Sequence, residues 1–251
     1  MDSGIVEADL ELWIRRFRPA LDTPVRLICF PHAGGSATYF APLAKAFPAA
    51  IDVVSVQYPG RQDRRTEPGL ESIGELADAA LDAVRSCADR PVALLGHSMG
   101  ALVAFEVAGR LEKDGVPVDA LFASGRRAPS TYRDELGLFT DDNSLIDELR
   151  KLRGTDPELL EDPEIQRMIL PALRSDYRAV GTYRWTAGIP LAAPIHVHVG
   201  QGDPRVSAAE AHAWSTHTSG EFTVSTYPGG HFYLNTQVAE VARAVSAQLN
   251  L

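Results

Sequence analysis

Residues 91–115 read PVALLGHSMGALVAFEVAGRLEKDG, and they are the most informative part of the chain for its fold. The apolar run VALL leads into the motif GHSMG at residues 96–100, which opens a helical pattern that ends before Gly115. A buried strand that turns sharply into a helix is the setting in which a G-x-S-x-G sequence exposes a reactive serine above a sheet. Glycines flank the serine because side chains two residues away on either side would collide in so sharp a turn.

Five further apolar segments have the pattern of buried strands, and amphipathic helical patterns lie between them. The strands are expected at residues 25–30, 52–59, 119–125, 194–200 and 221–228, and helices at residues 71–88, 100–113 and 238–249. Such alternation predicts an α/β fold with a mostly parallel central sheet and helices on both faces.

One long segment interrupts this alternation. Residues 133–183 contain no strand pattern, and residues 143–152 and 164–183 look helical. Because ligands of open parallel sheets bind at the carboxyl ends of the strands, we expect this segment to form a helical lid over that edge. The lid would be an insertion in a single domain of residues 1–251. An ordinary pair of sheet-covering helices is the alternative.

The composition is that of an ordinary globular protein, with 45% hydrophobic and 23% charged residues among 251. No apolar run reaches the roughly 18 to 20 residues that span a bilayer, and the N-terminus has no signal-peptide pattern, so a cytoplasmic protein without membrane contact is expected. The formal charge of −9 disfavours nucleic acid as a partner, because binding it depends on neutralising phosphates. A monomer is the default expectation.

A serine nucleophile needs a base and an acid that orients the base, and in this type of fold they follow in the order Ser, acid, His. Asp203 lies in GQGDP, directly after the strand pattern IHVHV, and His231 lies in PGGHF, directly after FTVSTY. Both therefore occupy the same edge of the sheet as Ser98. We expect His231 to take the serine proton and Asp203 to fix the tautomer of the imidazole.

The other histidines and acids have simpler interpretations. We expect His196 and His198 in the core or on a face of the sheet, and His97 packed or hydrogen-bonded within the turn. His212 and His217 are expected to be solvated, and His32 lies too early in the chain to be the base. The rival acids Asp119, Asp141 and Asp142 begin a strand or the helical segment instead of following a strand. No histidine cluster has metal-ligand spacing, and neither a metal nor a cofactor is predicted.

The loop HAGG at residues 32–35 follows the first expected strand. It resembles the glycine-rich loops that supply a backbone donor to the oxyanion of acyl-transfer reactions. The expected donors are the N–H groups of Ala33 and Met99, the latter at a helix N-terminus where negative charge is favoured. A phosphate-binding turn is a weaker alternative, because neither of the common nucleotide-binding glycine patterns is present. Cys29 and Cys87 are too few for a disulfide framework and are expected to be buried.

Seven short stretches spread over nearly the whole chain strengthen this interpretation: FPHAGGSA, YPGRQDR, GHSMGA, GRRAPS, LPALRSDYRAV, GDPRVS and PGGHFYL. Together they resemble the type II thioesterases of polyketide and nonribosomal peptide assembly lines. The resemblance implies an α/β-hydrolase fold, a helical lid, and a triad of Ser98, Asp203 and His231. It also implies a discrete enzyme that hydrolyses acyl groups from the phosphopantetheine thiol of carrier proteins. Related sequences often carry two acids in G-D-x-D-P, whereas GQGDP here keeps only Asp203.

The carrier partner raises an electrostatic question, because carrier proteins are usually acidic and this chain is acidic too. Docking would then need a local basic or apolar patch. The sequence offers Arg61, Arg64 and Arg65, or Arg126 with Arg127, unless these arginines form internal ion pairs. The small and medium apolar residues of the expected lid predict a preference for short acyl chains.

Other functions are compatible with the same motifs. A general carboxylesterase or lipase-like hydrolase would use the same triad. So would a chain-releasing thioesterase of a synthase, and so would an acyltransferase that passes the acyl group to an amine or alcohol. A non-catalytic binding module on the same scaffold is disfavoured, because it has no need for all of Ser98, Asp203 and His231.

Overall fold

The computed structural model describes residues 7–18, 22–133 and 141–251. Within these ranges seven strands form one sheet in the order β1-β3-β2-β4-β5-β6-β7. The strands are β1 (Ile14–Arg16), β2 (Val25–Phe30), β3 (Ile51–Val56), β4 (Val92–His97), β5 (Ala120–Ser124), β6 (Ile195–Gly200) and β7 (Phe222–Tyr227). All neighbours run parallel except β1, which pairs antiparallel with β3.

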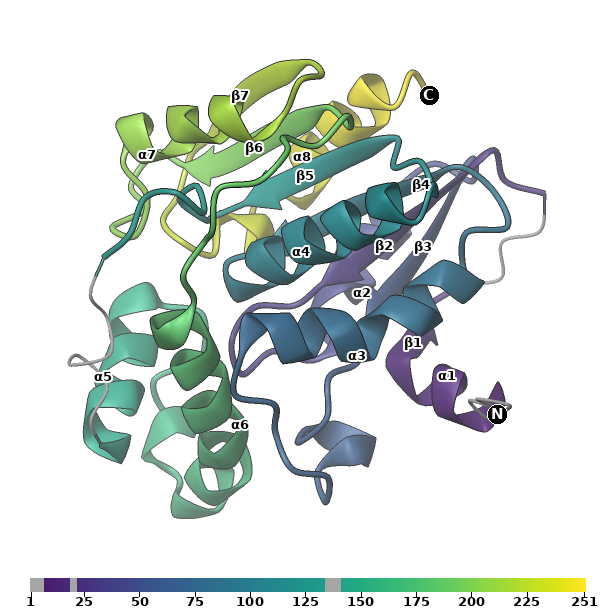
Figure 1. The fold of residues 1–251 in the computed structure, drawn as a ribbon. Coiled ribbons are helices and arrows are strands. Elements are labelled where there is room, and N and C mark those ends of the chain that lie inside the picture. The colour runs from purple at the N-terminus through teal and green to yellow at the C-terminus, as the bar shows by residue number, and fades with distance from the viewer. Residues whose placement is uncertain (1–6, 19–21, 134–140) are drawn as a thin grey trace.

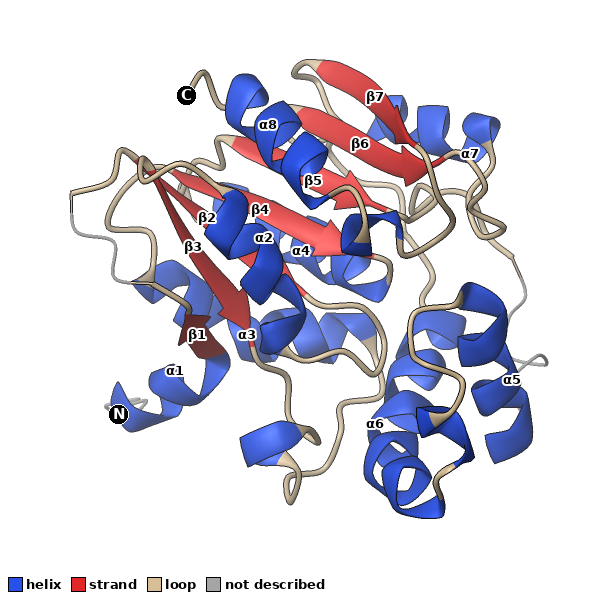
Figure 2. Ribbon diagram, turned by 180° about the vertical axis from the view of Figure 1, so that it is seen from behind, coloured by secondary structure: helices blue, strands red, loops and turns tan. Residues whose placement is uncertain are grey.

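Helices cover both faces of this sheet, as Figures 1 and 2 show from opposite sides. The described helices are α1 (Glu7–Trp13), α2 (Ala41–Ala46), α3 (Ile73–Ser86), α4 (Met99–Lys113), α5 (Asp142–Leu152), α6 (Pro163–Thr182), α7 (Ala208–His212) and α8 (Val238–Gln248). Helices α3 and α4 lie on one face, and α2 and α8 lie on the other. The predicted α/β fold with a mostly parallel sheet is therefore confirmed.

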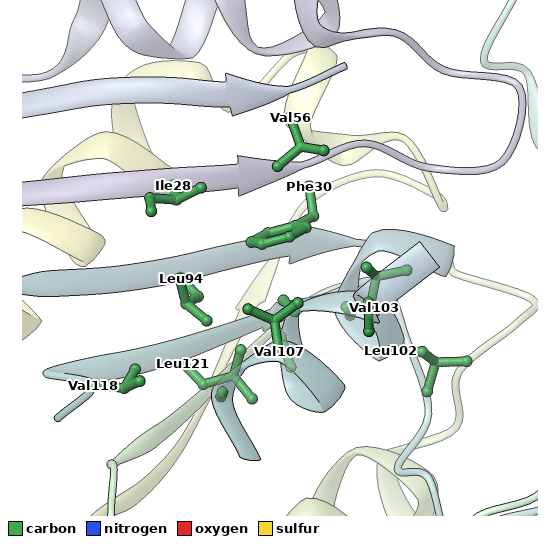
Figure 3. Close-up of a cluster of buried hydrophobic side chains, with 14 of the residues drawn as sticks. Ile28, Phe30, Val56, Leu94, Leu102, Val103, Val107, Val118 and Leu121 are labelled. Carbon is green, nitrogen blue, oxygen red and sulfur yellow. The ribbon is translucent and has the colours of Figure 1, made fainter. Parts of the chain in front are cut away.

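The core divides along the strands, because successive side chains of a strand point to opposite faces. Ile28 and Phe30 of β2 join the cluster under α3 and α4, whereas Leu27 and Cys29 join the cluster under α2 and α8. Figure 3 shows the first cluster, in which Phe30 packs among strand and α4 side chains. Burial of one such large apolar side chain contributes about 1.5–3 kcal/mol, so both layers hold the sheet in place.

The strand order reverses at β2, and this reversal positions the functional loops. The chain passes from β2 to β3 on one side and then to β4 on the other side of β2. Phe30 at the end of β2 pairs with Gly96 near the end of β4, so the loops that follow these two strands leave the sheet side by side. Such a switch point at the carboxyl edge of a parallel sheet is where ligands bind.

Helices α5 and α6 lie beyond this carboxyl edge in both ribbon views. They correspond to the two helices expected within residues 133–183, although residues 134–140 of that segment lie outside the described residues. Their action as a lid stays a prediction. None of the helices in the described ranges is long and apolar enough to cross a membrane.

Two local features differ from the sequence expectations. Strand β1 was not expected, because it has only three residues, two of which are arginines, and it pairs with β3 at the edge of the sheet. Helix α3 begins at Ile73 and not at residue 71, because Ser72 caps it: its hydroxyl accepts the Glu75 N–H at 3.1 Å.

Candidate active site

Ser98 lies on a strained turn between β4 and α4. Its φ of 55° and ψ of −116° fall outside the regions that non-glycine residues favour. A Cβ on Gly96 would lie 2.1 Å from the carbonyl oxygen of Gly100, and a Cβ on Gly100 would lie 1.9 Å from the carbonyl oxygen of Phe30. Both contacts are far too short, so both positions require glycine, as the motif predicts.

The side chains of Ser98, His231 and Asp203 form one chain of hydrogen bonds. His231 Nε2 lies 3.0 Å from Ser98 Oγ, and His231 Nδ1 lies 2.9 Å from Asp203 Oδ2. The side chains of His231 and Asp203 are 3% and 0% exposed. When the serine hydroxyl donates to Nε2 and Nδ1–H donates to the carboxylate, the imidazole is set to accept the serine proton. The three residues expected from the sequence thus lie together, and their catalytic roles stay a prediction.

The loops after β6 and β7 place the acid and the base next to each other. A Cβ on Gly200 would lie 2.1 Å from the Gly230 carbonyl oxygen, so the two loops approach to backbone contact. The backbone N–H of Arg205 donates to Asp203 Oδ1 at 2.8 Å. This bond turns the other carboxylate oxygen, Oδ2, toward His231.

Two further imidazoles surround the triad, and burial keeps them neutral. His97 Nδ1 lies 2.9 Å from Ser124 Oγ, which lies 2.6 Å from the hydroxyl of Tyr233. Burial lowers the pKa of His97 well below its ordinary value, and nearby imidazoles act in the same direction. Burial also lowers the pKa of His32 to about 3, again aided by nearby positive charge. Neutral rings at these places add no positive charge beside the triad.

A cavity of about 30 Å³ opens beside Ser98. Its lining includes Ala33 and Met99, together with Leu152 of α5 and Val180 of α6. Met99 is the first residue of α4, so its N–H has no acceptor within the helix. The two expected oxyanion donors therefore line the same small space as the serine. That space holds about one water molecule, so an acyl group needs the side chains of α5 or α6 to move aside.

Two ion pairs join α5 and α6 to the loops around the triad, and the sequence did not indicate either. Glu148 of α5 pairs with Arg205. Asp176 of α6 pairs with Arg61 at 2.9 Å and accepts the Gly34 N–H at 2.7 Å. Asp176 lies within the quoted stretch LPALRSDYRAV, but no pattern there points to a partner 115 residues earlier in the chain.

The prediction that His217 is solvated is wrong. It is 1% exposed, its ring lies 4.7 Å from that of Trp185, and its Nε2 lies 2.9 Å from Ser130 Oγ. The reason is local: α7 ends at His212 and the chain continues as a 3-10 helix, Ala213–His217, which turns His217 inward against Trp214. Burial lowers the pKa of His217 to about 4.

The remaining histidine expectations agree with the structure. His196 and His198 are buried, His97 is buried and hydrogen-bonded within the turn, and His212 is exposed. Both cysteines are buried and free, as expected. Within the described ranges, His, Cys, Asp and Glu side chains form no group of three that could hold a metal ion.

The arginines suggested as docking patches are mostly buried. Arg61 and Arg64 are each 6% exposed and pair with Asp176 and Glu67, respectively. Arg127 is 3% exposed. Internal ion pairing, the alternative interpretation, is therefore correct for Arg61 and Arg64.

Comparisons with known proteins add to this geometry. A family model described as Thioesterase domain matches residues 25–249. Thioesterase PikA5 from Streptomyces venezuelae is 46% identical over 246 residues, which cover 97% of this chain and 88% of that protein. A probable cadicidin biosynthesis thioesterase from Streptomyces griseus is 45% identical over 248 residues, covering 95% of this chain and 69% of that protein. Among solved structures, the type II thioesterase BorB from the borrelidin biosynthetic cluster has a TM-score of 0.89 and 48% identity, and the match covers 95% of this chain and 98% of that one.

Proposed function

The chain belongs to the thioesterase family, and we propose that it hydrolyses acyl groups from the phosphopantetheine thiol of carrier proteins in polyketide or nonribosomal peptide synthesis. The observation that carries the proposal is the hydrogen-bonded chain of Ser98, His231 and Asp203 beside a cavity lined by two backbone donors. Likeness to a type II thioesterase supports an editing role, in which aberrant or stalled acyl units are removed in the cytoplasm.

The first half of the reaction transfers the acyl group to the enzyme. Ser98 Oγ attacks the thioester carbonyl while His231 Nε2 accepts the hydroxyl proton, over the 3.0 Å that separates them. The C–S bond then breaks, and His231 returns the proton to the departing thiol. Asp203, fully buried against Nδ1, stabilises the imidazolium between these two steps.

The second half releases the acid. A water molecule gives a proton to His231 Nε2 and attacks the acyl-serine carbonyl. The bond to Ser98 Oγ breaks, and the serine recovers its proton from His231. The products are a free carboxylic acid and a free phosphopantetheine thiol. Both tetrahedral intermediates carry an oxyanion, which is stabilised by the N–H of Ala33 in the loop after β2 and by the N–H of Met99 at the N-terminus of α4.

A basic groove between α5 and the loop after β6 supports approach of an acidic carrier. It has a volume of about 840 Å³, and its lining includes the cations Arg150, Lys151, Arg153 and Arg205 together with Asp147 and Glu148, which pair with Arg150 and Arg205. A second hollow of about 490 Å³ shares Lys151 and Arg153 and reaches His231. Lys151 and Arg153 are exposed and, within the described part of the chain, have no ion-pair partner. The groove thus offers local positive charge for the phosphodiester and for an acidic partner, despite the net charge of −9.

The small cavity supports the expected preference for short acyl chains. With only about 30 Å³ beside the serine, a compact acyl group displaces side chains such as Leu152 or Val180, and a longer chain has to displace more of them.

A comparison of matched esters tests the proposed activity. The same short acyl group is presented on the phosphopantetheine of a carrier protein and on a simple oxygen ester. We expect rapid deacylation of the carrier and slow cleavage of the oxygen ester. Fast cleavage of the oxygen ester with an untouched carrier would contradict the proposal and indicate a general esterase.

A further inference from the structure

The turn that carries the oxyanion donor Ala33 is held from outside by α6. The Gly35 N–H donates to the His32 carbonyl at 2.9 Å, which closes a four-residue turn over residues 32–35. Gly34 has a φ of +73°, as the third position of a type II turn requires. The hydrogen bond that closes the turn uses only the His32 carbonyl and the Gly35 N–H, so it leaves the N–H groups of Ala33 and Gly34 for acceptors outside the turn.

Asp176 is the acceptor for one of these two groups. Its Oδ2 receives the Gly34 N–H at 2.7 Å, and its Oδ1 receives Arg61 Nη2 at 2.9 Å. Arg61 also reaches the Gly35 carbonyl at 3.4 Å, so the ion pair holds both glycines of the turn. The Asp176 side chain is 0% exposed and that of Arg61 is 6% exposed. Water therefore does not compete for these bonds.

Helix α6 packs closely against the turn at residues 32–35. A Cβ on Gly34 would lie 2.6 Å from Leu173 Cδ2, one helical turn before Asp176. A Cβ on Gly69, in the segment before α3, would lie 2.2 Å from Ser175 Oγ, so α6 also packs closely against that segment. The middle of α6 is thus a packed part of the catalytic edge of the sheet, and a shift of Asp176 must shift the turn.

The ion pair with Arg61 offsets the negative charge of the Asp176 carboxylate. A lone buried carboxylate so close to the developing oxyanion would repel it. Burial raises the pKa of Asp176, while Arg61 and the Gly34 N–H oppose that change. The pair therefore delivers a strong acceptor to the turn without placing a net negative charge behind the oxyanion.

We propose that Asp176, paired with Arg61, is a positioning residue for catalysis: it fixes the turn at residues 32–35 so that the Ala33 N–H points at the oxyanion. This inference rests on the proposed function, because it assigns a role in the same reaction. It makes α6 a structural support of the oxyanion site, in addition to any role in covering the substrate.

Two double variants separate positioning from mere loss of a buried ion pair. Arg61→Met with Asp176→Leu removes the charges and the acceptor, and Arg61→Met with Asp176→Asn removes the charges but keeps a carbonyl acceptor for the Gly34 N–H. Apolar replacement of a buried ion pair is often neutral for stability. With a short acyl-N-acetylcysteamine thioester, we expect the leucine variant to lose about 30-fold in kcat and the asparagine variant less than about fivefold, with KM within about twofold in both.

A transition-state analogue provides a second readout. A trifluoromethyl ketone that forms a tetrahedral adduct with serine should lose affinity for the leucine variant by the same factor as kcat/KM. The matched control removes another buried pair, with Arg26→Met and Asp52→Leu, at the opposite end of β2 and β3. There Asp52 is also 0% exposed and lies 2.7 Å from Arg26. We expect this control to keep wild-type kcat per folded molecule.

A single variant keeps the test decisive if the leucine variant does not fold. Asp176→Glu keeps the ion pair but moves the carboxylate by one methylene, and we expect about a tenfold lower kcat with unchanged KM. Wild-type kcat in the glutamate variant, or equal losses in both double variants, would overturn the proposal. If the wild-type protein itself cleaves no thioester, the proposed function fails first, so the two failures are distinguishable.

Discussion

Ser98 combines the chemistry of the site with its backbone strain. A serine at φ 55° and ψ −116° is unfavourable relative to glycine, and such strain amounts to about 1–3 kcal/mol. The surrounding structure enforces it, because Gly96 and Gly100 allow β4, α4 and the end of β2 to pack at backbone contact. As a result, the Ser98 hydroxyl projects from the turn toward His231.

This strain predicts an effect on stability that is separate from activity. Ser98→Gly and Ser98→Ala both remove the proposed nucleophile, but only glycine relieves the strain. We expect the glycine variant to be more stable than the alanine variant by about 1 kcal/mol, after the greater chain entropy of glycine in the unfolded state is subtracted. Urea titration of the two inactive proteins measures the difference. Equal stability, or a less stable glycine variant, would show that the turn is not strained.

Asp203 predicts a different signature. Asp203→Asn keeps the shape of the side chain but cannot accept the Nδ1–H of His231 in the same way, so the wrong tautomer is favoured. By analogy with other Ser-His-Asp enzymes, we expect kcat to fall by about 10⁴ while the melting temperature changes little. A steady-state assay with a small thioester measures this. A loss below tenfold would mean that another group orients the imidazole.

For individual residues, the sequence was informative where a residue directly follows a recognisable strand. Ser98, Asp203 and His231 could be predicted because each directly follows a strand in a fixed order. Asp176 could not, because its role depends on a turn and an arginine that only the folded chain brings to it. His217 was mistaken for a solvated residue because helical spacing does not reveal where a short helix changes to a 3-10 turn.

At the level of secondary-structure elements, the 3-10 helix Ala213–His217 buries an imidazole, and this burial should make the free energy of unfolding depend on pH. The pKa of His217 is lowered to about 4 in the folded state by burial, whereas the unfolded chain has the ordinary value of 6.5. Between these values the unfolded state binds more protons, so stability is complete above pH 6.5 and falls as the pH falls toward 4. The contribution amounts to on the order of 3 kcal/mol across this window.

His217→Gln keeps a polar group near Ser130 but does not titrate. We expect its unfolding free energy to depend less steeply on pH between 4 and 6.5 than that of the wild type, while His212→Gln, at an exposed position, serves as the matched control. Urea titrations at several pH values give both slopes. Identical slopes for wild type and His217→Gln would mean that His217 is protonated equally in the folded and unfolded states.

Strands were the most predictable elements, because β2 to β7 are segments of five or six residues in which apolar side chains recur, and proline, glycine or a charged residue lies near most of their ends. Strand β1 was not predicted because its three residues, two of which are arginines, have no apolar pattern. Only its pairing with β3 in the folded chain identifies it as a strand. The exact start of α3 depends on which nearby residue caps the helix. The sequence does not distinguish Ser72 from its neighbours as the cap.

For the molecule as a whole, the basic groove predicts a partner-specific effect. Charge reversal at Lys151 and Arg153 should raise KM for an acyl-carrier protein by about tenfold and leave a small thioester unaffected, because steering acts only on the charged partner. Arg65→Glu, also at an exposed position, is the matched control. Activities on carrier and small thioester measured at low and high salt check this. Equal losses on both substrates would reject the groove as the docking surface.

Charge counted over the sequence could not locate this groove. A net charge of −9 says that the protein and an acidic carrier repel on average, but the local distribution depends on which arginines the fold buries. Arg61 and Arg64 are buried in ion pairs. Lys151 and Arg153, at the C-terminus of α5, are instead exposed beside the loop that contains Asp203. Only the packing of α5 against the catalytic edge reveals that arrangement.

Following the carrier and the enzyme in one reaction tests whether Ser98 is the nucleophile that hydrolyses carrier-bound thioesters. Acyl-loaded carrier is mixed with wild-type enzyme or Ser98→Ala, the reaction is quenched at short times, and intact masses of carrier and enzyme are recorded. We predict that the carrier loses its acyl group, that wild-type enzyme transiently gains it on Ser98, and that the alanine variant is slower by about a millionfold. Deacylation of the carrier by Ser98→Ala at the wild-type rate would contradict the account.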